Sequence, residues 1–263
     1  MKNDLIYVYC LTDSLPLIAL SNVSEGIEFL RIKDFYAILK YVSNVEFAEE
    51  NLKKNISDIK WLENNARGHI NVISSFMKNQ TVIPFKFGTI FQTEDSLKKF
   101  IYDYDESLTE NFQFIENKEE WSIKIYCSRE SLCQQIDILS SEAASLEKQI
   151  MASLPGKAFI LKHKKKELIE KELNRLCKNF GQNYYDIFSS LSVSTRLNNL
   201  LPKEFTGRVD SMILNATFLI NKSMVPEFIF TVEIMQKSDK STGFFIESTG
   251  PWPPFSFINI KEK

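Results

Sequence analysis

The sequence predicts an α+β protein organised in two domains. Its 263 residues exceed the roughly 100–200 residues of one typical domain. Stretches in which apolar and polar residues alternate, as in half-buried strands, are interleaved with stretches whose apolar residues recur at helical three- and four-residue steps. Because this interleaving occurs in both halves of the chain, each half is expected to combine a sheet with helices.

The first half is expected to form short strands and long helices. No proline occurs between residues 46 and 77, and an apolar stripe runs from Leu52 through Ile70 to Met77, which predicts one long helix. Residues 81–91 are expected to form a strand pair or a bent strand around Pro84 and Gly88. Further strands are predicted at 5–11, 17–20, 27–32, 35–41 and 121–127, and a further helix at 96–114.

The second half begins with helical spacing and ends with strands. The break Leu154-Pro155-Gly156 separates two predicted helices, 130–153 and 158–180. Alternation then predicts strands at 186–193, 211–220, 243–247 and 255–260, with a short helix after Pro226. The expected domains are therefore residues 1–128 and 156–263, joined by a helical connector at 129–155.

Composition and charge exclude several classes of protein. A net charge of −2 argues against a globally basic nucleic-acid binder. No uncharged apolar run approaches the roughly 18 residues of a transmembrane helix. Asp4 and Asp13 interrupt the N-terminal apolar stretch, so no signal peptide is predicted and a cytoplasmic location is expected.

The cysteines show no metal or redox spacing. None of the intervals among Cys10, Cys127, Cys133 and Cys177 is the two-residue spacing of a zinc knuckle or a thioredoxin-like site. They are expected to be reduced and to behave as small apolar side chains. A disulfide between Cys127 and Cys133 is the alternative.

Motifs that carry catalysis are missing from the sequence. There is no Gly-x-Ser-x-Gly elbow and no glycine-rich phosphate loop. The chain has two histidines: His69 is expected to be structural, and His163 lies among lysines and is expected to be solvated. The acidic run from Asp103 to Glu106 is expected to be a solvated helix face. We therefore predict no enzyme, no catalytic residue, no metal and no cofactor.

Two apolar motifs are more unusual. Residues 82–91, VIPFKFGTIF, mix aromatic side chains with Pro84, which a sheet tolerates only at an edge, an end or a bulge. Residues 250–258, GPWPPFSFI, form a stiff segment because each proline fixes φ. We expect this segment to begin a terminal strand with Trp252 buried in the core, the alternative being an exposed docking element.

The C-terminal motif resembles the signature of the gas vesicle protein F/L family (GvpF/GvpL), usually seen as GPWPPYSF. Other blocks match in order: residues 5–11 resemble the opening strand of the family, and 82–91 its "lPlrFGt" block, which His69 precedes as a histidine does in the family. Residues 120–125 resemble its "EWgvKv" element, 156–162 its "GraYL" helix start and 215–220 its "naaYLV" strand. Phenylalanine replaces the usual tyrosine, and lysine the usual arginine, at Phe159, Phe218, Phe255 and Lys86.

The resemblance implies a structural accessory protein of gas vesicle assembly with a ferredoxin-like, antiparallel C-terminal domain. It implies binding to the hydrophobic shell protein GvpA, and to other Gvp accessory proteins, during nucleation or growth of the shell. It also implies a cytoplasmic location on the gas vesicle, with no nucleic acid and no lipid membrane as partner. The alternative is a ferredoxin-like nucleic-acid-binding module, against which the net charge argues.

Residues in the two unusual motifs are the candidate sites. The candidates for partner binding, expected at a sheet edge with at most half of their side chains free, are Pro84, Phe85, Phe87 and Phe91. The structural family motif consists of Gly250, Pro251, Trp252, Pro253, Pro254 and Phe255.

Overall fold

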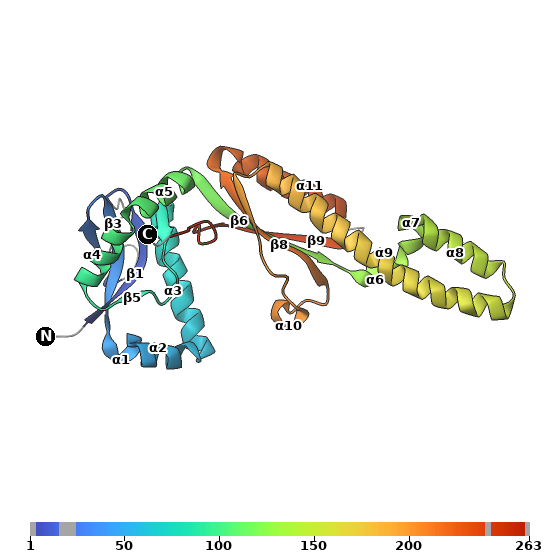
Figure 1. The fold of residues 1–263 in the computed structure, drawn as a ribbon, viewed down its shortest axis with the longest axis horizontal. Coiled ribbons are helices and arrows are strands. Elements are labelled where there is room, and N and C mark those ends of the chain that lie inside the picture. The colour runs from blue at the N-terminus through green and yellow to red at the C-terminus, as the bar shows by residue number, and fades with distance from the viewer. Residues whose placement is uncertain (1–3, 16–24, 240–242, 261–263) are drawn as a thin grey trace. The chain divides into compact units, whose positions relative to one another are not determined.

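A computed structural model of the chain describes residues 4–15, 25–239 and 243–260, and the strand expected at 17–20 lies outside these residues. The chain forms two compact units (Figure 1): residues 1–120 together with 251–263, and residues 121–250. The expected boundaries do not coincide with these units. The residues of the expected connector, 129–155, lie inside the second unit, and the last residues of the chain return to the first.

Unit 1 is built on an antiparallel sheet with the strand order β2-β3-β1-β4, in which β5 also pairs with β1. Its strands are β1 (Asp4–Thr12), β2 (Glu28–Ile32), β3 (Phe35–Ser43), β4 (Val82–Pro84) and β5 (Ile90–Phe91). The expected strands at 5–11, 27–32 and 35–41 are confirmed as β1, β2 and β3. Pro84 ends the edge strand β4 opposite Cys10, a position at which a missing N–H donor is tolerated.

The helix expected between residues 46 and 77 is three helices. They are α1 (Asn44–Phe47), α2 (Glu49–Ile56) and α3 (Ile59–Met77). The backbone is extended at Ala48 and at Asp58, and the Asp58 carboxylate accepts hydrogen bonds from the N–H groups of Lys60 and Trp61. This side-chain cap starts α3 as a new helix. The helix expected at 96–114 is likewise divided, at Tyr104, into α4 (Glu94–Asp103) and α5 (Asp105–Ile115).

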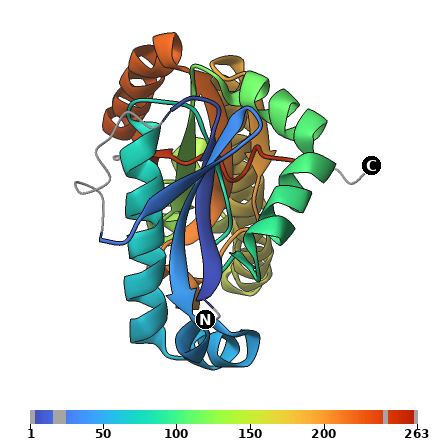
Figure 2. The ribbon, with the colours of Figure 1, turned by 90° about the vertical axis from the view of Figure 1, so that its left-hand side faces the viewer.

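Each face of the sheet in unit 1 carries its own core. Figure 2 shows the sheet between α3 on one side and α4 and α5 on the other. Ile6, Val8 and Leu11 pack under α4 and α5, whereas Cys10 packs under α3. The register of β1 shifts between Val8 and Cys10, so Val8 and Leu11 reach the same face although they are three residues apart. This bulge therefore redirects the side chains of β1.

Unit 2 has the element order of a ferredoxin-like domain. Its sheet has the strand order β7-β8-β6-β9, and its main elements follow one another as β-α-β-β-α-β, the ferredoxin-like arrangement. These elements are β6 (Lys118–Cys127), α9 (Pro155–Ser190), β7 (Ser194–Leu197), β8 (Ser211–Asn221), α11 (Val225–Asp239) and β9 (Phe244–Trp252). α10 (Lys203–Thr206) and the 3-10 helix η2 (Lys222–Met224) are short connections. The strands expected at 121–127, 211–220 and 243–247 are confirmed.

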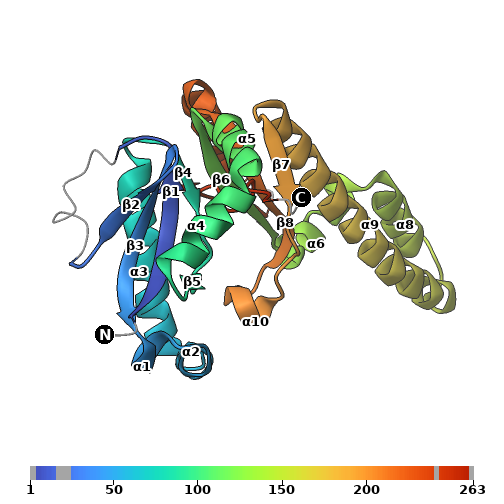
Figure 3. The same ribbon diagram turned by 60° about the vertical axis from the view of Figure 1, so that its left-hand side comes forward.

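Four helices separate β6 from β7. They are α6 (Arg129–Gln134), α7 (Ile136–Leu139), α8 (Ser141–Met151) and α9. The expected helix 130–153 is thus divided among α6, α7 and α8. α8 and α9 form a hairpin (Figure 3), and the ammonium of Lys165 in α9 pairs with Asp137 in α7 at 2.8 Å and with Glu147 in α8 at 2.9 Å.

Two of the expected strands are wrong. Residues 186–190 continue α9, because Phe180, Tyr184 and Phe188 are spaced by four residues and stack along the helix, and Tyr184 and Phe188 belong to the core of unit 2. Residues 255–257 form a turn, and residues 258–260 have no regular secondary structure, so the expected strand is not there. There the N–H of Phe255 donates to the carbonyl of Pro253 at 2.7 Å.

Candidate functional site

A buried hydrogen-bonded pair, Tyr7 and His69, lies between β1 and α3 in unit 1. The Tyr7 hydroxyl is 2.8 Å from Nδ1 of His69, and Nε2 of His69 is 2.9 Å from the carbonyl oxygen of Phe85. A carbonyl only accepts, so Nε2 carries the proton and Nδ1 accepts from Tyr7. The Tyr7 oxygen in turn accepts from the N–H of Gly88 at 3.3 Å. The pair therefore connects α3 to the turn between β4 and β5.

Burial holds both members of the pair neutral. His69 is 2% exposed, and this burial lowers its pKa, while the hydrogen bond to Phe85 acts in the opposite direction. Burial also raises the pKa of Tyr7 above its ordinary value. Since both ring nitrogens are engaged, neither is available as a base. This arrangement agrees with the expectation that His69 is structural.

The turn held by this pair needs glycine. The N–H of Thr89 donates to the carbonyl of Lys86 at 3.1 Å, and Gly88 within the turn has a φ of +81°. This left-handed conformation is costly for residues that carry a Cβ atom. Gly88 therefore positions its own N–H against Tyr7.

A pocket of about 390 Å³ opens beside the pair. Aromatic side chains from β1, α1 and the β4–β5 turn line it together with His69, namely Tyr7, Tyr9, Phe47 and Phe87. Polar side chains line the remainder, among them Lys40, Ser43, Glu46, Asn64 and Asn65. A site of this kind can accept an apolar side chain and bind polar groups at its rim.

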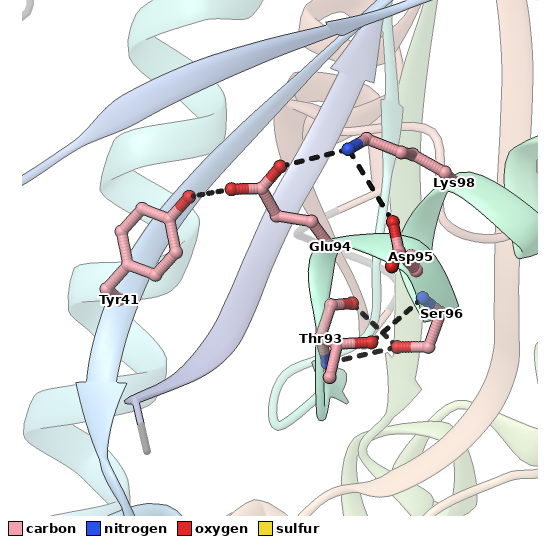
Figure 4. Close-up of polar contacts among 6 residues, drawn as sticks. All are labelled: Tyr41, Thr93, Glu94, Asp95, Ser96 and Lys98. Atoms are coloured by element: carbon pink, nitrogen blue, oxygen red, sulfur yellow. Dashed lines mark hydrogen bonds and ion pairs between the residues drawn. The ribbon is translucent and has the colours of Figure 1, made fainter. Parts of the chain in front are cut away.

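Tyr41, which also lines the pocket, connects β3 to the start of α4 (Figure 4). Its hydroxyl donates to Glu94 at 2.9 Å, and Lys98 pairs with the same carboxylate at 3.1 Å. Burial, followed by the hydrogen bond to Glu94, raises the pKa of Tyr41 to about 12, and the same bond lowers the pKa of Glu94. Thr93 and Ser96 cap α4 reciprocally. This wall of the pocket is therefore fixed by polar contacts.

The candidate partner-binding residues do not share one surface. Pro84 and Phe85 are buried, and Phe85 belongs to the core under α4 and α5. Phe91 is partly buried and packs against that same core. Phe87 lines the pocket, where its ring contacts those of Trp61 and His69. Of the four side chains, Phe87 is thus the one that faces the pocket.

The C-terminal motif is anchored by its prolines rather than by its tryptophan. Pro253 and Pro254 are buried, whereas Trp252, the last residue of β9, is 40% exposed. The expectation that Trp252 is mostly buried is therefore wrong. Phe255 stacks on His69 with ring centroids 6.5 Å apart, and Phe257 is 8% exposed. Aromatic burial is thus supplied by the residues that follow the prolines.

Two polar clamps hold the residues after this motif to unit 1. The carboxylate of Glu120, which is 5% exposed, accepts from the N–H of Ser256 at 2.9 Å and from its hydroxyl at 2.7 Å. The Asn111 side chain accepts from the N–H of Asn259 at 2.9 Å and donates to its carbonyl at 3.1 Å. Together with the packing of Ile258 and Ile260 against the core, these bonds explain why the chain end belongs to unit 1.

Sequence reasoning missed a cluster of exposed apolar side chains at the turn of the α8–α9 hairpin. Their exposed fractions are 77% for Met151, 81% for Leu154, 73% for Phe159 and 62% for Ile160. We call these four residues the hairpin tip. The signal in the sequence was the pair of large apolar residues, Phe159 and Ile160, that comes shortly after the Pro155-Gly156 break. Clustered exposure of this kind is typical of interaction sites.

The described residues offer no metal site and no membrane span. No group of three or more His, Cys, Asp or Glu side chains placed to hold a metal ion occurs within residues 4–15, 25–239 and 243–260. None of the helices in those same ranges combines the length and apolar character that crossing a membrane requires. The acidic residue Asp105 pairs with Lys33 at 2.9 Å, and His163 is exposed.

Comparisons with known proteins agree over nearly the whole chain. Residues 5–259 match the family described as gas vesicle synthesis protein GvpL/GvpF. Gas vesicle protein L of Streptomyces sp. (strain CB03234) is 22% identical over 261 residues, which cover 98% of this chain and 94% of that protein.

Two crystal structures share the fold. GvpF from Anabaena sp. PCC7120 superimposes with a TM-score of 0.72 at 18% identity, covering 98% of this chain and 100% of that one. GvpF from Microcystis aeruginosa superimposes with a TM-score of 0.67 at 21% identity, covering 98% and 99%. By its sequence along nearly its full length, the chain belongs to the GvpL/GvpF family of gas vesicle proteins.

Proposed function

We propose that this protein is a structural accessory protein of gas vesicle assembly. In this role it binds the hydrophobic shell protein GvpA, and other Gvp accessory proteins, in the cytoplasm during nucleation or growth of the shell. Membership of the GvpL/GvpF family supports the gas vesicle role. The neutral Tyr7–His69 pair, with its ring nitrogens occupied, supports a binding role rather than a catalytic one.

The observation that carries this proposal is the hairpin tip. A shell subunit that builds a gas-facing wall must keep its apolar surface covered until it assembles. The hairpin tip exposes four large apolar side chains within ten residues, and burying them against an apolar partner would remove this surface from water. Lysines flank the cluster at Lys157, Lys162 and Lys164, which keeps the hairpin soluble before a partner binds.

The pocket of unit 1 is a second candidate for the contact with GvpA. Within the block 82–91, which was expected to bind a partner, Phe87 is the residue whose side chain lines this pocket. An apolar side chain of GvpA could enter between Phe47 and Phe87, while Asn64 and Asn65 meet polar groups at the rim. Pro84 and Phe85 would contribute indirectly, by holding the turn in place.

A nucleic-acid-binding role is less well supported. Base stacking on a ferredoxin-like sheet needs accessible aromatic side chains. In unit 2, Phe218 of β8 packs between Phe188 of α9 and Phe228 of α11, and all three are fully buried. These aromatic rings build the core.

The proposal is tested by co-expression with affinity-tagged GvpA, followed by co-purification. The wild-type chain is expected to co-purify, and the double variant Leu154→Asp/Phe159→Asp is expected to lose most of this capture with an unchanged melting temperature. Phe230→Asp is the matched control, because Phe230 lies on α11 of the same unit and is 63% exposed. Equal capture of the wild type, the tip variant and the control would remove the hairpin tip as the GvpA contact.

A further inference from the structure

Two free thiols meet in unit 2, far from the pocket residues in the sequence. Cys127 is the last residue of β6 and Cys177 lies in α9, 50 residues later. Their sulfur atoms are 3.1 Å apart and share a hydrogen bond, and both are reduced. A disulfide bond is about 2.03–2.05 Å long, so the sulfurs need to approach by only about 1 Å. The pair was not expected from the sequence, which suggested Cys127 and Cys133 as the alternative.

The two thiols differ in accessibility. Cys127 is fully buried, whereas Cys177 is partly exposed. Around them, Leu132, Leu173 and Phe244 form a small apolar core together with Cys127. A reagent from solution therefore reaches the sulfur of Cys177 first. Cys127 is buried in apolar surroundings, which disfavour ionisation of its thiol.

The charges near the pair also favour Cys177 as the nucleophile. The hydrogen bond from Cys127, assisted by the positive charge of Arg129, lowers the pKa of Cys177, while the same bond and burial raise the pKa of Cys127. Arg129 is held in position, because its guanidinium donates to Asn174 at 2.9 Å and to Glu170 at 2.6 Å. Asn174 and Glu170 precede Cys177 on α9.

The other two cysteines lack such a setting. Cys10 is buried in the core of unit 1, where burial raises its pKa. Cys133 is exposed on α6. It can react with reagents from solution, and it thereby provides an internal comparison for simple accessibility.

We propose that Cys127 and Cys177 form a reactive dithiol that a low-molecular-weight disulfide converts into an intramolecular disulfide. The thiolate of Cys177 attacks one sulfur of the reagent, which releases one thiolate and leaves a mixed disulfide on Cys177. Cys127 then gives up its proton and attacks the sulfur of Cys177, which expels the second thiolate. In sum, two protein thiols and one reagent disulfide yield one protein disulfide and two reagent thiols.

The new bond would fasten the base of the helical hairpin. It joins β6 of the sheet to α9, and the 50-residue interval that it closes contains α6, α7, α8 and the first part of α9. Cross-linking an interval of this length restricts the unfolded chain and so stabilises the folded one. The oxidised protein is therefore expected to melt several degrees above the reduced protein.

Oxidised glutathione is the probe for this reaction, with the full-length Cys133→Ser variant as the starting protein. Its intact mass is expected to fall by two hydrogens, with no glutathione attached, and digestion is expected to yield one peptide pair joined through Cys127 and Cys177. The double variant Cys127→Ser/Cys133→Ser should trap one glutathione on Cys177. The double variant Cys133→Ser/Cys177→Ser should form neither the disulfide nor an adduct on Cys127.

Circular dichroism confirms the fold of each variant before oxidation. The proposal is overturned if folded Cys133→Ser protein keeps the thiols of Cys127 and Cys177 unmodified under conditions that attach glutathione to Cys133 of the wild type. It is also overturned if the mixed disulfide remains on Cys177 although Cys127 is present. A trapped adduct on Cys127 instead of Cys177 would contradict the assigned order of attack.

Discussion

The Tyr7 hydroxyl donates to Nδ1 of His69 across 2.8 Å, and this bond makes the histidine part of the scaffold. It fixes the proton on Nε2, which donates to the carbonyl of Phe85. The 82–91 block is thereby held against α3 through two residues that lie far from each other in the sequence. Packing of Phe255 on the same imidazole adds the C-terminal motif to this arrangement.

Replacing Tyr7 by Phe tests the pair directly. The change leaves Nδ1 of His69 and the N–H of Gly88 without this partner in a buried site, so the free energy of unfolding should fall by about 1–3 kcal/mol. Urea denaturation measures it. Tyr102→Phe is the control, because Tyr102 is 53% exposed and its change should stay within about 0.5 kcal/mol. Equal effects of both changes would contradict the buried bond.

The stability of unit 1 should depend on pH through His69. The folded protein lowers the pKa of this residue from its ordinary value of 6.5, so below pH 6.5 the unfolded chain binds a proton that the folded chain does not. The stabilisation is therefore fully present above pH 6.5 and is lost as the pH falls toward the folded-state pKa. His69→Gln should flatten the pH dependence of unfolding between pH 8 and pH 5.

His163→Gln is the control for that titration, because His163 is exposed on α9, and it should keep the wild-type profile. An identical profile for wild type and His69→Gln would show that His69 does not titrate on unfolding as described. If the hairpin tip rather than the pocket is the GvpA contact, His69→Gln should also change the affinity for GvpA by less than about threefold, which corresponds to under 1 kcal/mol.

The anchor of the C-terminal segment is expected at Phe257 rather than at Trp252. Phe257→Ala removes a ring that is 8% exposed and should cost about 3–5 kcal/mol, as truncations of core aromatics do. Trp252→Ala should cost clearly less, since Trp252 is 40% exposed. Melting curves of the two variants decide the order. A larger loss for Trp252→Ala would restore the tryptophan as the anchor.

Phe87 is the test of the pocket as a GvpA contact. Phe87→Ala opens one aromatic wall, and it should lower GvpA capture at least severalfold if an apolar side chain of GvpA enters there. Phe29→Ala is the matched control, because Phe29 lies on the edge strand β2 and is 42% exposed. If Phe87→Ala stays folded and captures GvpA as well as Phe29→Ala does, the 82–91 block is not the contact.

Much of the fold could be predicted because local patterns decide it. Short runs of apolar, β-branched and aromatic residues identified β1, β3 and β8, and most of the residues in these strands are buried. Within the 46–77 stretch, the break between α2 and α3 depends on one side chain: Asp58 caps α3, and an apolar stripe that continues across the break concealed that signal. Likewise, the four-residue steps from Phe180 to Phe188 that extend α9 resemble alternation when only 186–193 is considered.

The sites depend on contacts that no local pattern contains. Tyr7 and His69 are separated by 62 residues, and Cys127 and Cys177 by 50, so only the folded chain brings them together. The exposure of Trp252 followed from where the chain end is held, through Glu120 and Asn111. The hairpin tip likewise became visible only when α8 and α9 were known to form a hairpin.

The solubility of GvpA is the most direct test of the proposed function. GvpA is expressed with and without the wild-type chain, in a host that lacks all other gas vesicle proteins, and the soluble fraction of GvpA is measured. A chain that covers the apolar surface of the shell protein should raise this fraction and should elute together with GvpA in size-exclusion chromatography. An unchanged soluble fraction, with the two proteins eluting separately, would contradict the proposal that this chain binds GvpA.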